Sequence, residues 1–468
     1  MRRVALSLLL VNALAAGTSV HAQTTNDAVS SANTQGSNAQ SETAPAQLPL
    51  SRTARRPRRI SGRVAFSLYS SKIIGAQGTD ARRFDQFVTS VRYQMTPTEP
   101  NDFDLRIDAR LARYPGSERP GRSSVYEASV GRRFADGRFA LRGGQMWLQN
   151  LGGLGSVGGV LGEYRARTST PLGRPRFGVF TGLEPEILDA AYVSGVRKTG
   201  GYVAFEGSGR RRHAVGYVNI RHSGMTERSV VSLLNFVPIG QSFFLYQASQ
   251  YDLSGSAGNG KGRLTYFLTN VRQKLGPITE VSGSFHRGRS IDARSVTNNL
   301  LAGRPVSDQM LEGLRFESAS GRLTVRPVES VRVFLGLSRS KNDRADVSTR
   351  RTNVGGHVSD LLHSGLDVTV YQAWLDRGIS QYKSWDISVG RQLGRRLYVR
   401  GDYSTSLSIF RVLSGSEYVI ENSPPIRRFE LSGNVSLPQR FSLVTTMSIL
   451  RGDDADEHQW FFSLSRSF

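Results

Sequence analysis

The chain has 468 residues, a mean hydropathy of −0.32 and a formal net charge of +23, and it contains no cysteine. Such polarity excludes a helical membrane protein, which needs repeated stretches of roughly 20 apolar residues. The lack of cysteine excludes disulfide scaffolds and thiolate metal sites.

The first 22 residues predict a secretory signal peptide. Arg2 and Arg3 precede an apolar run over 4–16, and Val20-His21-Ala22 provides a cleavage site after Ala22. A retained anchor helix is the alternative. Export separates the chain from cellular DNA, so we expect no nucleic-acid partner despite the charge. Anionic lipid, surface polysaccharide or anionic solutes are the expected counterparts.

Residues 23–59 predict a disordered periplasmic linker, because they are rich in Ser, Thr, Asn and Gln and contain few large apolar residues. The segment ends in a basic run that includes Arg55, Arg56 and Arg58. We expect a solvated tether, with contact to anionic lipid, the cell wall or a periplasmic partner as the alternative. The segment is too short for the globular plug of the largest plugged barrels.

From residue 60 onward, apolar and polar residues alternate with a period of two, as in 104–111, 331–338, 366–371 and 428–435. Each segment spans about ten residues, the length that a tilted strand needs to cross a bilayer. A soluble sandwich would need fewer and shorter strands. The predicted strands are 61–70, 84–95, 103–113, 123–133, 138–146, 158–168, 176–183, 200–207, 211–222, 226–237, 242–251, 262–273, 278–287, 313–326, 330–340, 348–361, 364–375, 381–392, 396–406, 426–436, 440–450 and 459–468.

These strands predict an all-β fold, a transmembrane antiparallel up-and-down β-barrel of about 22 strands over 60–468 without a plug domain. The connections sort by parity into a short set and a longer set. With both termini in the periplasm, the short set lies on the periplasmic side and the longer set is extracellular. The loops expected to narrow the lumen are 147–157, 184–199, 288–312 and 407–425.

The last nine residues carry Trp460, Phe462, Leu464 and Phe468 on one strand face. This pattern resembles the C-terminal signal of bacterial outer-membrane β-barrel proteins, apart from Arg466. The resemblance implies recognition by the barrel assembly machinery and an outer-membrane location in a Gram-negative bacterium, next to lipid and lipopolysaccharide. The resemblance concerns the architecture of porin-like barrels and does not assign the chain to a single family.

Three motifs do not fit a catalytic or cofactor site. Gly153–Gly158 matches G-x-G-x-x-G without the strand, helix and acidic residue of a dinucleotide site. His357 and Asp360 would point to opposite faces of a strand, which argues against a metal site that includes His363. Ser284 and His286 share a strand face but no acid partner is evident. We expect no cofactor, no metal and no enzymatic activity.

The remaining candidates are charged residues on the polar faces of the predicted strands, which we expect to line the lumen. The leading hypothesis is a channel for hydrophilic solutes that favours anions. A component of an export or envelope-assembly system and a structural or adhesive barrel are the alternatives. The candidate lumen-lining residues are Asp104, Arg106, Asp108, Arg110, Arg332, Arg400, Asp402, Arg428 and Glu430.

Overall fold

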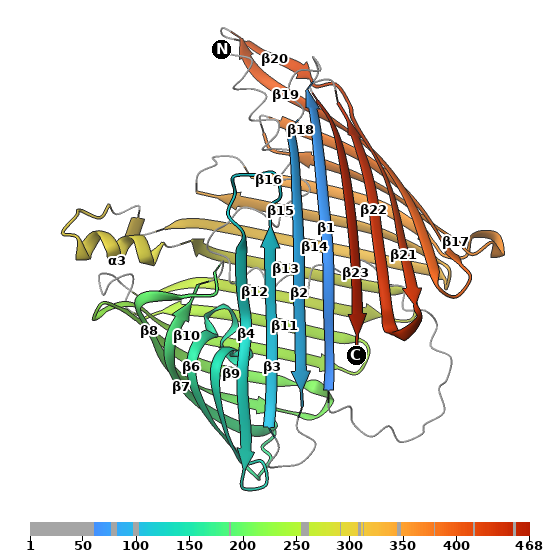
Figure 1. Ribbon diagram of the computed structural model, residues 1–468. Helices are drawn as coiled ribbons and strands as arrows, with labels where there is room; N and C mark the ends of the chain where they lie inside the picture. Colours follow the sequence, from blue (N-terminus) through green and yellow to red (C-terminus); the bar gives the residue numbers. More distant parts are fainter. Residues whose placement is uncertain are drawn as a thin grey trace.

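The computed structural model forms one closed antiparallel β-barrel, with strands that follow one another around the wall (Figure 1). The predicted signal peptide and linker lie outside the described residues. The structure describes residues 60–75, 82–96, 103–186, 189–253, 262–290, 292–307, 310–311, 313–343, 348–378, 380–414, 417–452 and 455–468.

The first half of the wall is β1 (Ile60–Gly75), β2 (Arg82–Met95), β3 (Phe103–Arg113), β4 (Arg122–Phe134), β5 (Phe139–Trp147), β6 (Ser156–Arg165), β7 (Arg174–Pro185), β8 (Tyr192–Glu206), β9 (Arg212–His222), β10 (Met225–Ile239), β11 (Phe243–Asp252) and β12 (Arg263–Leu275). The second half is β13 (Thr279–Ser290), β14 (Leu314–Val328), β15 (Val331–Asn342), β16 (Thr349–Val358), β17 (Leu366–Asp376), β18 (Ser380–Leu393), β19 (Leu397–Ser414), β20 (Glu417–Asn422), β21 (Ile426–Leu437), β22 (Phe441–Arg451) and β23 (Ala455–Ser467).

The barrel closes where the first strand pairs with the last, in a register that runs from Arg63 opposite Ser467 to Gly75 opposite Ala455. β19 pairs with β20 along its far end and with β21 along the rest, so these two strands share one position in the wall. The result is a closed antiparallel barrel of 22 strands. The predicted fold class is confirmed.

Alternation along the strands separates an apolar outer face from a more polar inner face. On β15, Leu335 and Leu337 are 43% and 55% exposed, whereas the neighbouring Phe334 is buried. Phe429 and Leu431 on β21 are exposed in the same way. A closed barrel satisfies its backbone groups without edges, and an apolar outer face suits a hydrocarbon environment. The protein is therefore an integral β-barrel of the bacterial outer membrane.

We call the end of the barrel where β1 begins and β23 finishes the turn end, and the opposite end the loop end.

Several strands differ from their predicted bounds. β8 begins at Tyr192 instead of residue 200. Its first half belongs to the wall, where Val196 and Lys198 occupy buried inward positions. Pro175, Pro185, Pro238 and Pro327 all lie within two residues of a strand end, where a missing N–H is tolerated.

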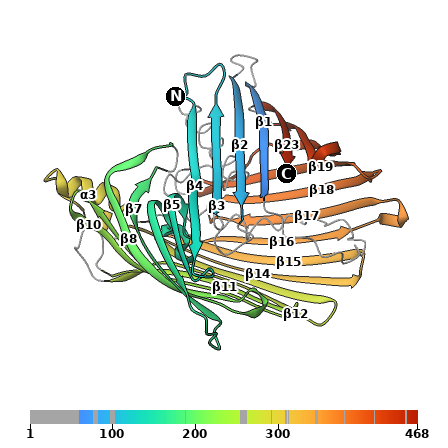
Figure 2. The same ribbon diagram turned by 60° about the horizontal axis from the view of Figure 1, so that its bottom comes forward.

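Two elements lie in the longer connections. The 3-10 helix η1 (Gln149–Leu154) joins β5 to β6. The helix α3 (Ala293–Leu301) joins β13 to β14 and lies at the rim beside β8 and β10 (Figures 1 and 2). Three loop-end connections, 223–224, 377–379 and 452–454, are short, so length alone does not sort every connection. Among the described residues, no helix is long and apolar enough to cross a membrane.

α3 is held to the rim by an ion-pair cluster. Arg294 lies 2.8 Å from Glu227 and 2.6 Å from Glu184, and Lys198 lies 3.1 Å from Glu184. Burial lowers the pKa of the Arg294 guanidinium, but its hydrogen bonds and the charges of the two glutamates outweigh this effect and raise the pKa. Ala293 and Val296 of the same helix are buried. The loop between β13 and β14 is therefore fixed to the ends of β7 and β10.

Candidate functional site

The connection between β5 and β6 folds into the barrel. Its ends are joined by a hydrogen bond from the Leu148 amide to the Gly155 carbonyl at 2.8 Å. Its centre, η1, contacts β8, β9 and β10, which lie further along the wall. Leu151 is completely buried. The loop therefore crosses part of the lumen and packs on the inner wall.

Unusually for the polar interior of a large barrel, the wall that receives this loop is apolar. Gly216 allows the closest approach, since a Cβ there would lie 2.1 Å from Cδ2 of Leu151. Loop and wall form one buried cluster, so η1 is anchored by hydrophobic packing. Its members are Met146, Leu148, Leu151, Leu154, Val157, Leu161, Phe180, Val196, Tyr202, Ala204, Ala214, Val218, Ile220, Val230, Leu234 and Ala248.

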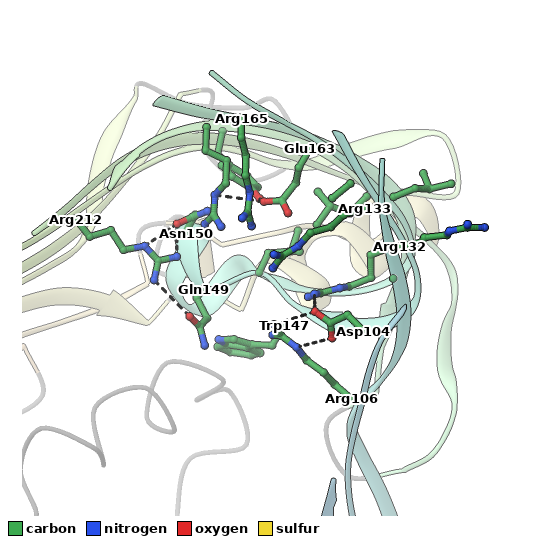
Figure 3. Close-up of a pocket in the computed structure, with 18 residues that line it drawn as sticks. Asp104, Arg106, Arg132, Arg133, Trp147, Gln149, Asn150, Glu163, Arg165 and Arg212 are labelled. Atoms are coloured by element: carbon green, nitrogen blue, oxygen red, sulfur yellow. Dashed lines mark hydrogen bonds and ion pairs between the residues drawn. The ribbon is translucent and has the colours of Figure 1, made fainter. Parts of the chain in front are cut away.

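A pocket rich in arginine lies where η1 meets the inner faces of β3 to β9, and Figure 3 shows its side chains. Apart from Arg132, whose side chain points to the outer face, the lining holds six arginines and two carboxylates. Trp147 adds an aromatic surface, and Gln149 and Asn150 come from the loop itself. We call the inward-facing set the arginine pocket: Asp104, Arg106, Arg133, Arg142, Trp147, Gln149, Asn150, Glu163, Arg165, Arg176, Tyr202 and Arg212.

Two carboxylates organise part of the pocket. Asp104 is buried and accepts from Arg106 at 3.2 Å and from Arg142 at 2.6 Å. Glu163 lies 3.3 Å from Arg176 and accepts a hydrogen bond from the Tyr202 hydroxyl. Each buried carboxylate is thus matched with arginine, as low-dielectric surroundings require.

The loop is tied to the pocket by an arginine of β9. Nε of Arg212 donates to Oδ1 of Asn150 at 2.9 Å, and Nη1 donates to Oε1 of Gln149 at 3.3 Å (Figure 3). These acceptors are neutral amides, so the charge of Arg212 is solvated but not neutralised. The contact holds η1 in place and leaves positive charge on its surface.

Arg133 and Arg165 add further positive charge to the arginine pocket. Among the described residues, neither has a carboxylate within ion-pair distance. Nε of Arg165 is buried and has no hydrogen-bond partner in the part of the chain that the structure describes. The pocket therefore presents guanidinium groups that an anion can bind.

The structure places the predicted charged residues in more than one group. Asp104 and Arg106 line the arginine pocket, and Asp108 lies 2.8 Å from Arg92. Arg110 lies on the same face of β3 as these residues.

A second group lies on β19 and β21. Arg400 pairs with Asp402 at 2.6 Å, and Arg428 pairs with Glu430 at 2.5 Å. Asp402 is directly opposite Glu430 in the register. Arg332 of β15 is apart from them, opposite His357.

The sequence-based reading missed most of the arginine pocket, including Arg133, Arg142, Arg165, Arg176 and Arg212. Each of these residues occupies an inward position of its strand. The glycine-rich run after Trp147 indicated a loop that enters the lumen, but nothing in the run specified which strands the loop would contact.

The rejected motifs take structural roles. Ser284 shares a hydrogen bond with Ser320 at 2.6 Å, and His286 lies between the rings of Tyr266 and Phe316. Gly153–Gly158 forms the end of η1 and the start of β6. In the described part of the chain, no three His, Asp or Glu side chains gather as metal ligands would.

The last strand places Trp460, Phe462, Leu464 and Phe468 on the outer face. Trp460 and Phe462 are 53% and 45% exposed, and Leu464 and Phe468 follow on the same side. The backbone of Phe468 exchanges two hydrogen bonds of 3.0 Å with Gly62, which completes the closure. Arg466 stacks over the Phe441 ring at 5.2 Å. A role of this face as an assembly signal stays a prediction.

No protein-family model matches the sequence, and no curated protein matches it. Solved structures align over most of the chain. Pseudomonas aeruginosa OpdO gives a TM-score of 0.42 at 10% identity over 87% of this chain and 97% of that chain. The P pilus usher (PapC) translocation pore gives 0.44 at 13% identity over 86% and 99%. Acinetobacter baumannii OccAB1 gives 0.39 at 10% identity over 87% and 97%. At this level the likeness carries no argument, and the assignment as an outer-membrane β-barrel rests on the strand pairing and the outer face.

Proposed function

We propose that the protein is a passive channel for hydrophilic solutes that favours anions, with η1 as the constriction. The observation that carries this proposal is the arginine pocket, which lies where the inward loop and the inner wall meet. A barrel of this strand number has a wide interior, so an inward loop has a large effect on the free cross-section.

Electrostatics supports the preference for anions. Carboxylates compensate Arg106, Arg142 and Arg176, whereas Arg133 and Arg165 have none among the described residues. Low-dielectric walls focus the field of such uncompensated charge into the lumen and raise the local concentration of anions. Arginine keeps this charge at every physiological pH.

Reversal potentials in a KCl gradient across a planar bilayer test the proposal. We expect anion preference at low salt that fades as the Debye length shrinks from about 30 Å at 0.01 M to about 3 Å at 1 M. The variant R133Q/R165Q should lose part of the preference without loss of folding, because neither residue pairs with a buried carboxylate. Arg391→Gln, on the outer face of β18, is the matched control. A non-conducting or cation-preferring wild-type protein would end the proposal.

A further inference from the structure

The outer face of the barrel carries basic residues in directly opposed pairs near the loop end. The strand register places five such pairs on neighbouring strands around the wall, and we call their ten residues the basic girdle. The pairs are Lys72 with Arg83, Arg197 with Arg221, Arg289 with Arg315, Arg339 with Arg350, and Arg427 with Arg451.

The girdle residues face outward, because each shares its strand face with exposed apolar side chains. Arg339 follows Leu335 and Leu337 at intervals of two, and these leucines are 43% and 55% exposed. Arg427 precedes Phe429, which is 48% exposed. Arg221 follows Val215, which is 50% exposed, at intervals of two. The same parity holds for the other pairs.

Few of the girdle residues are neutralised by a carboxylate among the described residues. Arg83 has Asp85 at 2.8 Å and Arg315 has Glu317 at 3.3 Å. Asp376 is opposite Arg350 in the register, yet no ion pair forms. Seven girdle residues have no carboxylate within ion-pair distance among the described residues: Lys72, Arg197, Arg221, Arg339, Arg350, Arg427 and Arg451.

The turn end differs. Its outward positions are mostly apolar or aromatic, as at Phe103 and Phe139, which are 52% and 51% exposed. In the described part of the chain, the outward basic residues at this end are Arg132, Arg391 and Arg466, and two of them stack on aromatic rings. The two rims of the outer face are therefore chemically distinct.

Like charges that are directly opposite on neighbouring strands destabilise a sheet. Several such pairs on one rim need an anionic partner at the level of the membrane surface. Guanidinium groups bind phosphate through two parallel hydrogen bonds, and paired arginines at strand spacing offer two such forks. We propose that the basic girdle binds the phosphate groups of a phosphorylated glycolipid in the outer leaflet. This places the loop end on the cell surface, independently of the connection lengths.

Binding of diphosphorylated lipid A to the purified full chain in neutral detergent tests the proposal. The variant R339Q/R350Q/R427Q/R451Q removes two pairs, and R391Q/R466Q removes two outward arginines from the turn end as the matched control. Dephosphorylated lipid A tests the acyl chains alone, and inorganic pyrophosphate tests free phosphate. Native mass spectrometry gives the affinity, and thermal unfolding gives the stability.

We expect the girdle variant to bind lipid A at least about tenfold more weakly, with the control variant unchanged. Without lipid A, the girdle variant should unfold at the same or a higher temperature than the wild type, because the repulsion is gone. With lipid A, its stabilisation should be smaller. Equal binding by the girdle variant, an equal loss in the control, or equal effects of dephosphorylated lipid A or pyrophosphate would overturn the proposal. If the fourfold variant does not fold, R339Q/R350Q and R427Q/R451Q separately give the same comparison.

Discussion

Leu151→Ala tests whether hydrophobic packing of η1 sets the width of the lumen. Leu151 is completely buried and reaches the wall at Gly216. Truncation of a buried leucine to alanine costs about 2–5 kcal/mol. The barrel ladders do not pass through this residue, so the cost falls on the docking of the loop and leaves the wall intact.

A loss of about 3 kcal/mol raises the ratio of undocked to docked loop by about a hundredfold. L151A/L154A should add a second loss of similar size, because Leu154 is also buried in the cluster. In single-channel recordings at high salt, we expect L151A to show intermittent openings of larger conductance. The double variant should occupy the larger level for most of the time.

Leu362→Ala is the control, since this leucine is 90% exposed in the turn between β16 and β17. It should leave both conductance and noise unchanged. The heat-modifiable mobility of the folded barrel should be the same in all variants. Wild-type conductance and noise in a folded L151A/L154A protein would refute the idea that η1 constricts the lumen.

Cysteines at the two ends test the orientation: Glu118→Cys at the loop end should react with an impermeant maleimide on intact cells, and Gln439→Cys at the turn end should not. Deletion of Phe468 removes the two hydrogen bonds to the first strand, so the folded, heat-modifiable fraction should fall; an undiminished folded yield would contradict the closure argument. Arg294→Met leaves Glu227 without its arginine and should release α3, which limited proteolysis of the loop would detect. Arg294→Lys should restore part of the protection, and equal protease resistance in all three proteins would show that the ion pairs do not hold the helix.

The strands could be predicted because the bilayer imposes a strict pattern. Outward positions such as Leu335 and Leu337 must be apolar, and the residues between them face a different solvent, so the period of two is explicit in the sequence. The pattern is weakest where the outward residues are polar and the inward ones are buried. At the start of β8 the outward Arg197 and Thr199 are polar and exposed, whereas the inward Val196 is buried, and the start of this strand was predicted eight residues late.

The arginine pocket could not be predicted, because it depends on where one loop lands. Asp104 and Arg142 are far apart in the sequence, and strand pairing through β4 brings them within 2.6 Å. The apolar inner wall around Gly216 was a usable signal, since inward apolar residues in a large barrel need a partner inside the lumen. Identifying that partner as η1 required the three-dimensional arrangement.

The positions of the arginines also could not be predicted fully from the sequence. Alternation assigns each arginine to the inner or outer face, but it does not give the height of the residue along the barrel or the identity of its neighbour. Arg133 and Arg339 both occupy alternating strands, yet one adds positive charge to a pocket in the lumen and the other is opposite Arg350 on the outer rim. The strand register fixes both the face and the neighbour of each arginine, because a shift of one residue in the pairing would move every side chain to the other face. The described arginines therefore contribute to at least two separate surfaces, the arginine pocket and the basic girdle, and substitutions can address each surface separately.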